Sequence, residues 1–278
     1  MKIAFCGYDF FSASLSEILA RGHNVYRIFT VPCDNRVDFN QYIYAIGSEH
    51  NIPVTEERIT PQTIEQLRAE GCDLLITAAY FYKIPPLTDA GIRGINVHPT
   101  LLPIGRGAMP LPWTILTDQR VSGITVHKLT QDYDAGDILL QEPFAVEPRE
   151  RIESLSAKAQ IKAKEVLPRV LENFASYWHD ARPQSGPVSH WERLTKEQRT
   201  LDWTQSVNDL DRLSRALGKF GCFATFDDRN WWVYGVSAWH QSHNYQPGSV
   251  VHKTNTEMVV AAADGLVSLL YFQPIKRA

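Results

Sequence analysis

The sequence predicts an α/β fold, a mostly parallel sheet with helices on both faces, followed by a small barrel-like β module. Up to about residue 118, short apolar runs alternate with stretches of helical apolar spacing, which is typical of a parallel sheet. Residues 179–190 (HDARPQSGPVSH) are poor in apolar residues and rich in Pro, Ser, Gly and His, which indicates a linker. One helical stretch and about five short strand patterns follow it and indicate the second module.

In the first part we expect a Rossmann-like arrangement. Ser12 to Arg21 has apolar residues at helical spacing and ends before Gly22, and Pro61 opens another helical stretch. Residues 123–129 and 137–145 are predicted to be two antiparallel strands joined by the turn DYDAGD. The other expected strands are 2–6, 24–30, 52–54, 73–79 and 94–98, and the other expected helices are 37–49, 61–70 and 109–118.

Residues 150–178 are predicted to form one long amphipathic helix with a kink at Pro168. After the linker we expect a strand and turn at its start, a helix over 205–217, and strands near 222–227, 230–239, 248–253, 257–263 and 265–272. The predicted domains are therefore a catalytic domain over 1–180, a linker over 181–200 and a C-terminal module over 201–278.

Composition favours a cytoplasmic globular protein. The chain has 278 residues, 44% of them hydrophobic and 21% charged. Its four cysteines form no CxxC pair, which favours reduced thiols and no metal site. We expect no signal peptide and no membrane partner, because no apolar run is long enough. The net charge of −3, with equal numbers of acidic and basic residues over 201–278, argues against a nucleic-acid partner.

Common cofactor and nucleophile motifs are missing. The turn after the first strand, CGYDFFS, has one glycine where a dinucleotide fingerprint needs three. The sequence contains neither a Walker-type phosphate loop nor a GxSxG elbow. Cys6 lies inside the first strand and is predicted to be a core residue rather than a nucleophile.

The stretch INVHPTLLPIGRG (95–107) carries the candidate chemistry. Asn96 and His98 are two apart in a strand and therefore share a face at its carboxyl end. An amide donor and an imidazole can together polarise a carbonyl and handle one proton. The alternative is that Asn96 caps a turn and His98 is a half-buried histidine with satisfied hydrogen bonds. Asp134 follows in a loop that can approach a ligand closely, and a carboxylate near His98 would raise the pKa of the imidazole and fix its tautomer.

Three motifs in this order, NVHPTLLPxxRG (96–107), GITVH (123–127) and DYDAGDILLQ (132–141), resemble the folate-dependent formyltransferases. That family includes glycinamide ribonucleotide, methionyl-tRNA and amino-sugar formyltransferases. The opening KIAFCGYDFFSASLSEILARGHNV and the segment LLITAAYFYKIP are also similar to the family. LDWTQSVNDLDRLSRAL resembles the start of the C-terminal OB-like module of the tRNA and sugar enzymes.

The resemblance implies 10-formyltetrahydrofolate as formyl donor and a catalytic set of Asn96, His98 and Asp134, with no metal and no covalent intermediate. Asn96 and His98 would stabilise the oxyanion, and Asp134 would orient His98 and help move the amine proton through water. Folate contacts are implied, largely through the backbone, for Tyr82, Lys83, Ile84, Gln131, Asp132, Tyr133 and Gly136.

The expected acceptor is a small-molecule amine that Arg106, Gly107 and Trp113 would contact, with a nucleotide-linked amino sugar favoured. Trp113 could equally be a helix residue packed on the sheet. An amino-acid-type amine such as hydroxyornithine is the alternative. Methionyl-tRNA is less favoured because VPCDNRVDFNQ, after the second strand, has no basic cluster. A formyl-folate hydrolase is also less favoured, because its relatives usually carry an N-terminal regulatory domain.

The C-terminal module contains an aromatic cluster with two open interpretations. Its members are Trp231, Trp232, Tyr234 and Trp239. They could form a stacking site for a ligand ring. They could instead build a small core or an interface, including the contact of a homodimer.

Overall fold

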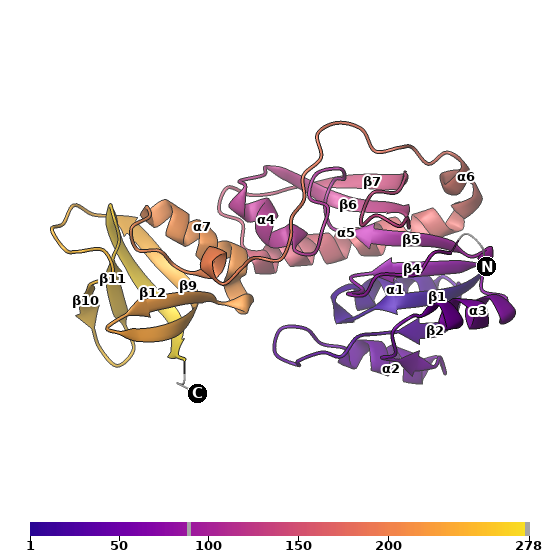
Figure 1. Cartoon of the computed structure of the whole chain (residues 1–278), viewed down its shortest axis with the longest axis horizontal. Helices are drawn as coiled ribbons and strands as arrows, with labels where there is room; N and C mark the ends of the chain where they lie inside the picture. The colour runs from indigo at the N-terminus through magenta and orange to yellow at the C-terminus, as the bar shows by residue number, and fades with distance from the viewer. Residues whose placement is uncertain (88–89, 276–278) are drawn as a thin grey trace. The chain divides into compact units, whose positions relative to one another are not determined.

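The computed structural model describes residues 1–87 and 90–275, which fold as two compact units (Figure 1). The first unit consists of Met1–Pro110, Val121–Ala145 and Ala157–Glu192. The second consists of Leu111–Arg120, Val146–Ser156 and Arg193–Ala278. In the described residues no helix is both long and apolar enough to cross a membrane.

The first unit is built on a seven-stranded sheet with the order β3-β2-β1-β4-β5-β6-β7. The first five of these strands are parallel, and β6 and β7 are antiparallel additions, as predicted. Because β1, β4 and β5 are parallel neighbours, their carboxyl ends meet at one edge, where ligands bind in such sheets. The strands are β1 Lys2–Gly7, β2 Asn24–Phe29, β3 Val54–Thr55, β4 Leu74–Ala78, β5 Arg93–His98, β6 Val121–Lys128 and β7 Ile138–Ala145.

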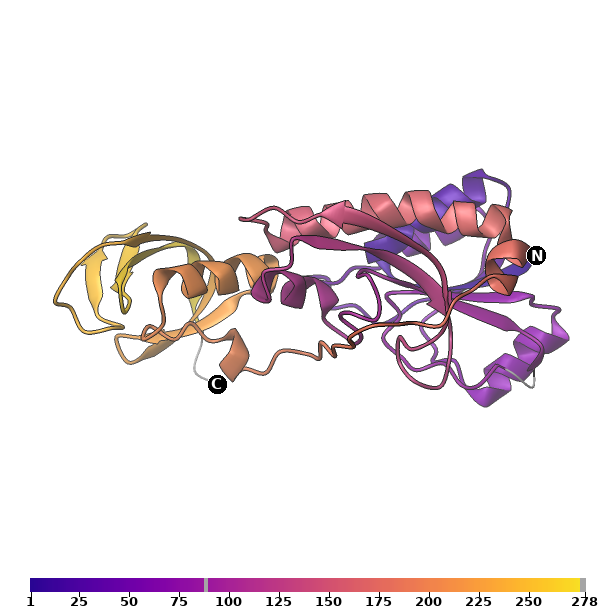
Figure 2. The same ribbon diagram turned by 90° about the horizontal axis from the view of Figure 1, so that it is seen from above.

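Helices cover both faces of this sheet, with α5 on one face and α3 on the other (Figure 2). The apolar runs of the strands are buried beneath them, and Cys6, in β1, is fully buried with its thiol pKa raised by that burial. The helical elements are η1 Asp9–Phe11, α1 Ser12–Ala20, α2 Gln41–Glu49, α3 Pro61–Ala69, α4 Pro110–Leu116, α5 Ile152–Glu172 and α6 Phe174–His179.

Two of the predicted helices differ from the structure by more than two residues at one end. The helix expected from residue 37 begins at Gln41, because the Asp9 carboxylate accepts the first free N–H groups, those of Tyr42 at 3.0 Å and Ile43 at 2.9 Å. The long helix expected over 150–178 continues through Pro168 and ends at Glu172. The helix breaks at Asn173, whose backbone is not helical, so its end was predicted six residues too late, and the kink expected at Pro168 stays a prediction.

The second unit contains α7 Val207–Leu217, with Ser206 as its N-cap, and an antiparallel sheet with the order β10-β11-β12-β9-β8. The predicted strands are present, but the strand expected at residue 201 is not, because only an isolated bridge joins Thr200 to Phe223. The remaining elements are η3 Glu197–Arg199, η4 Gly218–Phe220, β8 Cys222–Phe226, β9 Arg229–His240, β10 Val250–Lys253, β11 Met258–Ala261 and β12 Gly265–Pro274.

The aromatic cluster divides between the two faces of β9. Trp231 is buried and stacks on Phe226, with ring centroids 5.0 Å apart, so it is part of the core. Trp232 and Tyr234 lie on the opposite face, half-buried, and stack on each other. Trp239 is exposed. The residues predicted as one cluster therefore serve different purposes, because neighbours in a strand point to opposite faces.

Candidate active site

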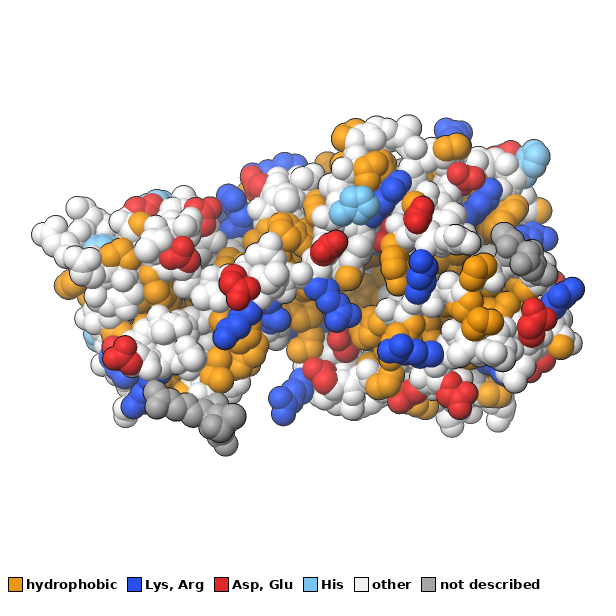
Figure 3. Space-filling model, in the orientation of Figure 1, with side chains coloured by type: hydrophobic (Ala, Val, Ile, Leu, Met, Phe, Trp, Pro, Cys, Tyr) orange, Lys and Arg blue, Asp and Glu red, His pale blue; other side chains and the backbone are white. Residues whose placement is uncertain are grey.

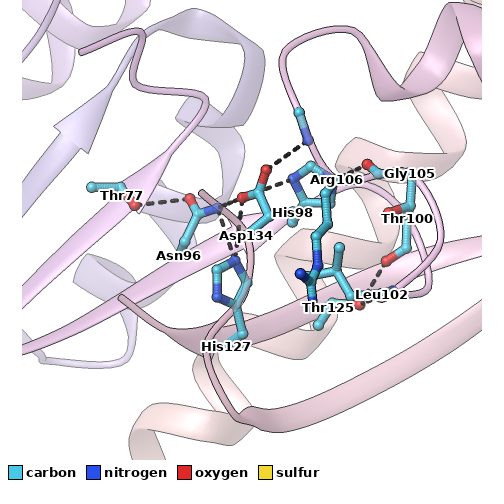
Figure 4. Close-up of polar contacts among 12 residues, drawn as sticks. Thr77, Asn96, His98, Thr100, Leu102, Gly105, Arg106, Thr125, His127 and Asp134 are labelled. Atoms are coloured by element: carbon cyan, nitrogen blue, oxygen red, sulfur yellow. Dashed lines mark hydrogen bonds and ion pairs between the residues drawn. The ribbon is translucent and has the colours of Figure 1, made fainter. Parts of the chain in front are cut away.

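Asn96 and His98 project from the carboxyl end of β5, next to Asp134 from the loop between β6 and β7 (Figure 4). His98 and Asp134 are both largely buried, with side chains 6% and 10% exposed. The three residues predicted as the catalytic set are thus brought together within the first unit.

The Asn96 amide is held in one orientation by its neighbours. Its Oδ1 accepts a hydrogen bond of 2.8 Å from Thr77 Oγ1, the residue beside it on β4. Its Nδ2 donates to Asp134 Oδ1 at 3.1 Å and to Nε2 of His127 at 3.1 Å. Both amide hydrogens are therefore engaged, one by Asp134 and one by His127.

The His98 imidazole bridges a carbonyl and a carboxylate. Its Nε2 lies 2.8 Å from the Gly105 carbonyl oxygen, which can only accept, so this nitrogen carries a hydrogen. Its Nδ1 lies 3.4 Å from Asp134 Oδ1. Burial lowers the pKa of His98, and the opposing attraction of Asp134 does not reverse this. At neutral pH the ring is therefore uncharged, with Nδ1 free to accept a proton.

The Asp134 carboxylate is ionised and held from several sides. Burial by itself would raise the pKa of Asp134, but His98, His127 and the Gly107 N–H outweigh it and hold the pKa well below its usual range. Oδ2 accepts the Gly107 N–H at 2.9 Å. The backbone of Asp134 is left-handed, with φ 53°, a conformation that Asp and Asn adopt more readily than other residues with a side chain.

Two glycines let the surrounding loops approach this centre. A Cβ on Gly136 would lie 1.9 Å from the Lys128 carbonyl oxygen, so only glycine lets the loop after Asp134 pass β6. Gly105, with φ +79°, faces the ring of Trp191, which a Cβ would meet at 2.4 Å. The carbonyl that positions His98 therefore depends on a residue with no side chain.

His127 is the last residue of the motif GITVH (123–127), and no role was predicted for it. The structure pairs His127 with Asn96 across β5 and β6, and His127 Nε2 lies 3.5 Å from Asp134 Oδ1. His127 Nδ1 donates to the Lys128 carbonyl at 2.8 Å, so in the neutral ring Nε2 accepts from Asn96. Only the cross-strand register could have identified it. Thr77 was missed for the same reason.

The residues predicted to bind folate lie on two segments that meet. Lys83 Nζ lies 5.6 Å from the centroid of the Tyr133 ring, and the Tyr133 side chain is 62% exposed. Tyr82 stacks against the Arg58 guanidinium at 4.1 Å. Ile84 packs against a buried apolar cluster, Gln131 and Asp132 are exposed, and Gly136 is in the same loop as Asp134.

The residues predicted to bind the acceptor are divided between the units. Arg106 and Gly107 are in the first unit beside Asp134, where the Arg106 guanidinium donates to Gln184. Trp113 is in the second unit, on α4, where its carbonyl accepts from Thr117 at 2.9 Å. Within the described residues, no group of three or more His, Cys, Asp or Glu side chains is arranged to hold a metal ion.

Comparisons with known proteins agree with this architecture. A family model described as "Formyl transferase" matches residues 3–171, and one described as "Formyl transferase, C-terminal domain" matches residues 193–278. The methionyl-tRNA formyltransferase of Ruminiclostridium cellulolyticum is 30% identical over 298 residues, covering 100% of this chain and 94% of the relative. That of Staphylococcus epidermidis is 26% identical over 285 residues, covering 98% and 91%.

Solved structures share the fold at lower identity. An N-formyltransferase from Helicobacter canadensis, in complex with folinic acid and dTDP-3-aminofucose, has a TM-score of 0.70 at 14% identity and covers 99% of this chain and 100% of its own. HypX from Aquifex aeolicus with tetrahydrofolic acid has a TM-score of 0.71 at 22% identity, and the match covers 99% of this chain and 44% of HypX. The chain thus spans less than half the length of HypX.

The two family models together cover most of the chain, and the 30% identical relative matches it from end to end. The protein belongs to the formyl transferase family.

Proposed function

We propose that Asn96, His98 and Asp134 catalyse transfer of the formyl group to the amine of a small molecule, with a nucleotide-linked amino sugar as the favoured acceptor. The observation that carries the catalytic part is that an amide and a neutral imidazole converge on one oxygen of an ionised carboxylate at the edge of the sheet where ligands bind. Asn96 Nδ2 lies 3.1 Å and His98 Nδ1 lies 3.4 Å from Asp134 Oδ1.

The reaction forms one bond and breaks another. The acceptor amine attacks the formyl carbon and forms a C–N bond, and the carbonyl oxygen takes up negative charge. Asn96 Nδ2 stabilises this oxyanion by redirecting to it one of the two hydrogens that it donates to Asp134 and His127. The bond from the formyl carbon to N10 of the folate then breaks, giving the N-formyl amine and tetrahydrofolate.

The proton of the attacking amine moves through the buried pair. Asp134 is ionised and His98 is neutral at neutral pH, so each can accept a proton as the amine becomes positively charged. The Gly105 carbonyl holds the ring so that Nδ1 faces the carboxylate. The proton is then returned to N10 as that nitrogen leaves, so the pair regains its starting state.

The donor fits the two segments that meet at Lys83 and Tyr133. A folate is a flat ring system attached to an anionic tail. Phe81, 41% exposed, and Tyr133, 62% exposed, offer aromatic surface at this edge, and Lys83 supplies a cation beside it. These residues would hold 10-formyltetrahydrofolate, the donor whose N10-formyl group is transferred.

Charge supports a small acceptor. A tRNA acceptor needs Lys and Arg side chains on its phosphates. The segment between β2 and α2 instead contains Asp34 and Asp38, and Asp34 Oδ1 accepts backbone N–H groups from Arg36 at 2.9 Å and Val37 at 3.0 Å. On the face shown in Figure 3, basic and acidic side chains are interspersed rather than gathered in a basic patch. Arg106 and Gly107 lie beside Asp134, and under this proposal they would contact the acceptor.

Methionyl-tRNA is the second candidate, because the relatives that are 30% and 26% identical over nearly the whole chain are methionyl-tRNA formyltransferases. The test incubates the enzyme and formyl donor with nucleotide-linked amino sugars, amino-acid-type amines and charged initiator tRNA, and detects the formylated product by mass. We expect a formylated sugar product, and we expect Asp134→Asn to lower its rate of formation strongly. Formylation of tRNA alone, with a steep dependence on salt, would contradict the acceptor assignment. Formate release without any amine would contradict transfer itself.

A further inference from the structure

The segment after α6 is mostly exposed, but one of its side chains, that of Gln184, is half-buried. Arg182, Pro183 and residues 185–188 are exposed. The Gln184 amide uses its full hydrogen-bonding capacity on two other segments of the first unit. Nε2 donates to the carbonyl oxygens of Asp134 at 2.7 Å and Gly136 at 2.9 Å. Oε1 accepts from Arg106, at 3.1 Å from Nε and 2.7 Å from Nη2.

We propose that Gln184 is a positioning residue for formyl transfer, which fixes Asp134 and the chain at Arg106 to each other without contacting the reacting atoms. This role rests on the proposed function of Asp134. The two donated bonds hold the backbone on both sides of Ala135, where Asp134 adopts its left-handed conformation. Aspartate adopts the left-handed conformation more readily than most residues, and the two bonds to the carbonyls of Asp134 and Gly136 hold the loop in that conformation.

The Gln184 amide also holds Arg106, the residue before the one whose N–H binds the Asp134 carboxylate. Gly107 N–H donates to Asp134 Oδ2 at 2.9 Å, and Arg106, the preceding residue, is held by Gln184. Asp134 is therefore connected to the 106–107 segment twice, once through its own side chain and once through Gln184. Together these bonds set the distance from Asp134 to His98.

Gln184 is itself held in place by backbone bonds at both ends of its segment. Arg182 exchanges hydrogen bonds with Ile138 in β7, at 2.8 and 3.0 Å. Ser189 accepts the N–H groups of Gly105, through its hydroxyl at 2.8 Å, and of Arg106, through its carbonyl at 3.0 Å. None of these bonds uses the side chain of residue 184, so replacing that side chain leaves the segment attached.

Two substitutions distinguish the contribution of the Gln184 Nε2 donor from that of the Oε1 acceptor. Gln184→Met keeps the length of the side chain and removes all four hydrogen bonds. Gln184→Glu keeps an acceptor for Arg106 but turns the donor into a second oxygen, which faces the carbonyls of Asp134 and Gly136. Gln62→Met, at an exposed position of α3, is the matched control.

The experiment measures kcat and KM for the formyl donor, together with thermal unfolding midpoints. We expect both Gln184 variants to lower kcat about tenfold to a hundredfold, as small misplacements of catalytic groups do, with KM changed less than about threefold. We expect Gln62→Met to match the wild type. Wild-type kcat in Gln184→Glu would overturn the proposal, because the carbonyl bonds would then be dispensable.

A double-mutant cycle provides the second test. If Gln184 acts through Asp134, then adding Gln184→Met to Asp134→Asn lowers turnover by less than about threefold further. Multiplying losses would overturn the proposal, since they would show an independent or general structural effect. The two proposals fail differently. Wild-type turnover in Asp134→Asn would refute the catalytic site, whereas a slow Asp134→Asn beside wild-type-like Gln184 variants would refute only the positioning role.

Discussion

Replacing Asp134 by asparagine should damage the enzyme in two measurable ways. In the native protein, Oδ1 accepts from Asn96 Nδ2 at 3.1 Å and Oδ2 accepts from the Gly107 N–H at 2.9 Å. An asparagine has a single oxygen, so in either orientation one of these donors faces an NH₂ group and loses its acceptor. Because the site is buried, that loss should lower the free energy of unfolding by about 1–3 kcal/mol.

The same substitution removes the ionised base. General acid–base groups typically contribute about 10²–10⁴ in rate, so we expect turnover to fall by that factor while the fold is kept. The assay combines urea denaturation with initial rates of tetrahydrofolate release in the presence of an amine acceptor. Asp137→Asn is the matched control, three residues away, where a half-buried ion pair with Lys128, 3.3 Å long, should be worth about 1 kcal/mol.

The pH dependence of stability gives an independent check on the direction of the Asp134 pKa shift. Because the folded pKa of Asp134 is depressed, the ionised form stabilises the native state fully above the unfolded pKa of about 3.9. That contribution is lost as the pH falls below this value towards the folded pKa. Asp134→Asn should therefore lose less stability on acidification than the wild type. Equal stability of the two proteins at pH 7, with turnover within about threefold, would refute the reasoning.

Three further outcomes are expected. Burial lowers the folded pKa of His98, so the unfolded chain takes up the proton first, and stability should fall as the pH drops through about 6.5; His98→Gln should flatten this slope in urea titrations. Gly136→Ala places a Cβ 1.9 Å from the Lys128 carbonyl oxygen and should cost about 1–3 kcal/mol by thermal denaturation, whereas Gly235→Ala, with 3.5 Å to its nearest neighbour, should not. Ser206→Ala removes the N-cap of α7 and should destabilise by about 1 kcal/mol; an unchanged midpoint would mean that the cap contributes nothing.

Local pattern determined the elements of this protein and two of its site residues. The apolar periodicity of each segment is set by a few neighbouring residues, so the parallel strands, the antiparallel pair and the five C-terminal strands follow from it. Asn96 and His98 share a face because they are two apart in a strand. The ends of helices that depend on distant groups could not be predicted from local pattern. The start of α2 is an example, because it is set by the Asp9 carboxylate.

The sequence by itself thus determined which residues are chemically able to act, and the order of the motifs indicated which family they resemble. Only the tertiary structure decided how those residues are held. His127 contacts Asn96 through strand register, and Gln184 reaches Asp134 from a position 50 residues further along the chain. Such contacts depend on backbone paths that bring remote segments together, and no periodicity within either segment encodes the distance between them. Asn96 and His98 could be predicted to act together because their shared face is a local property of one strand. Their support could not be predicted, because positioning is a property of the packed fold.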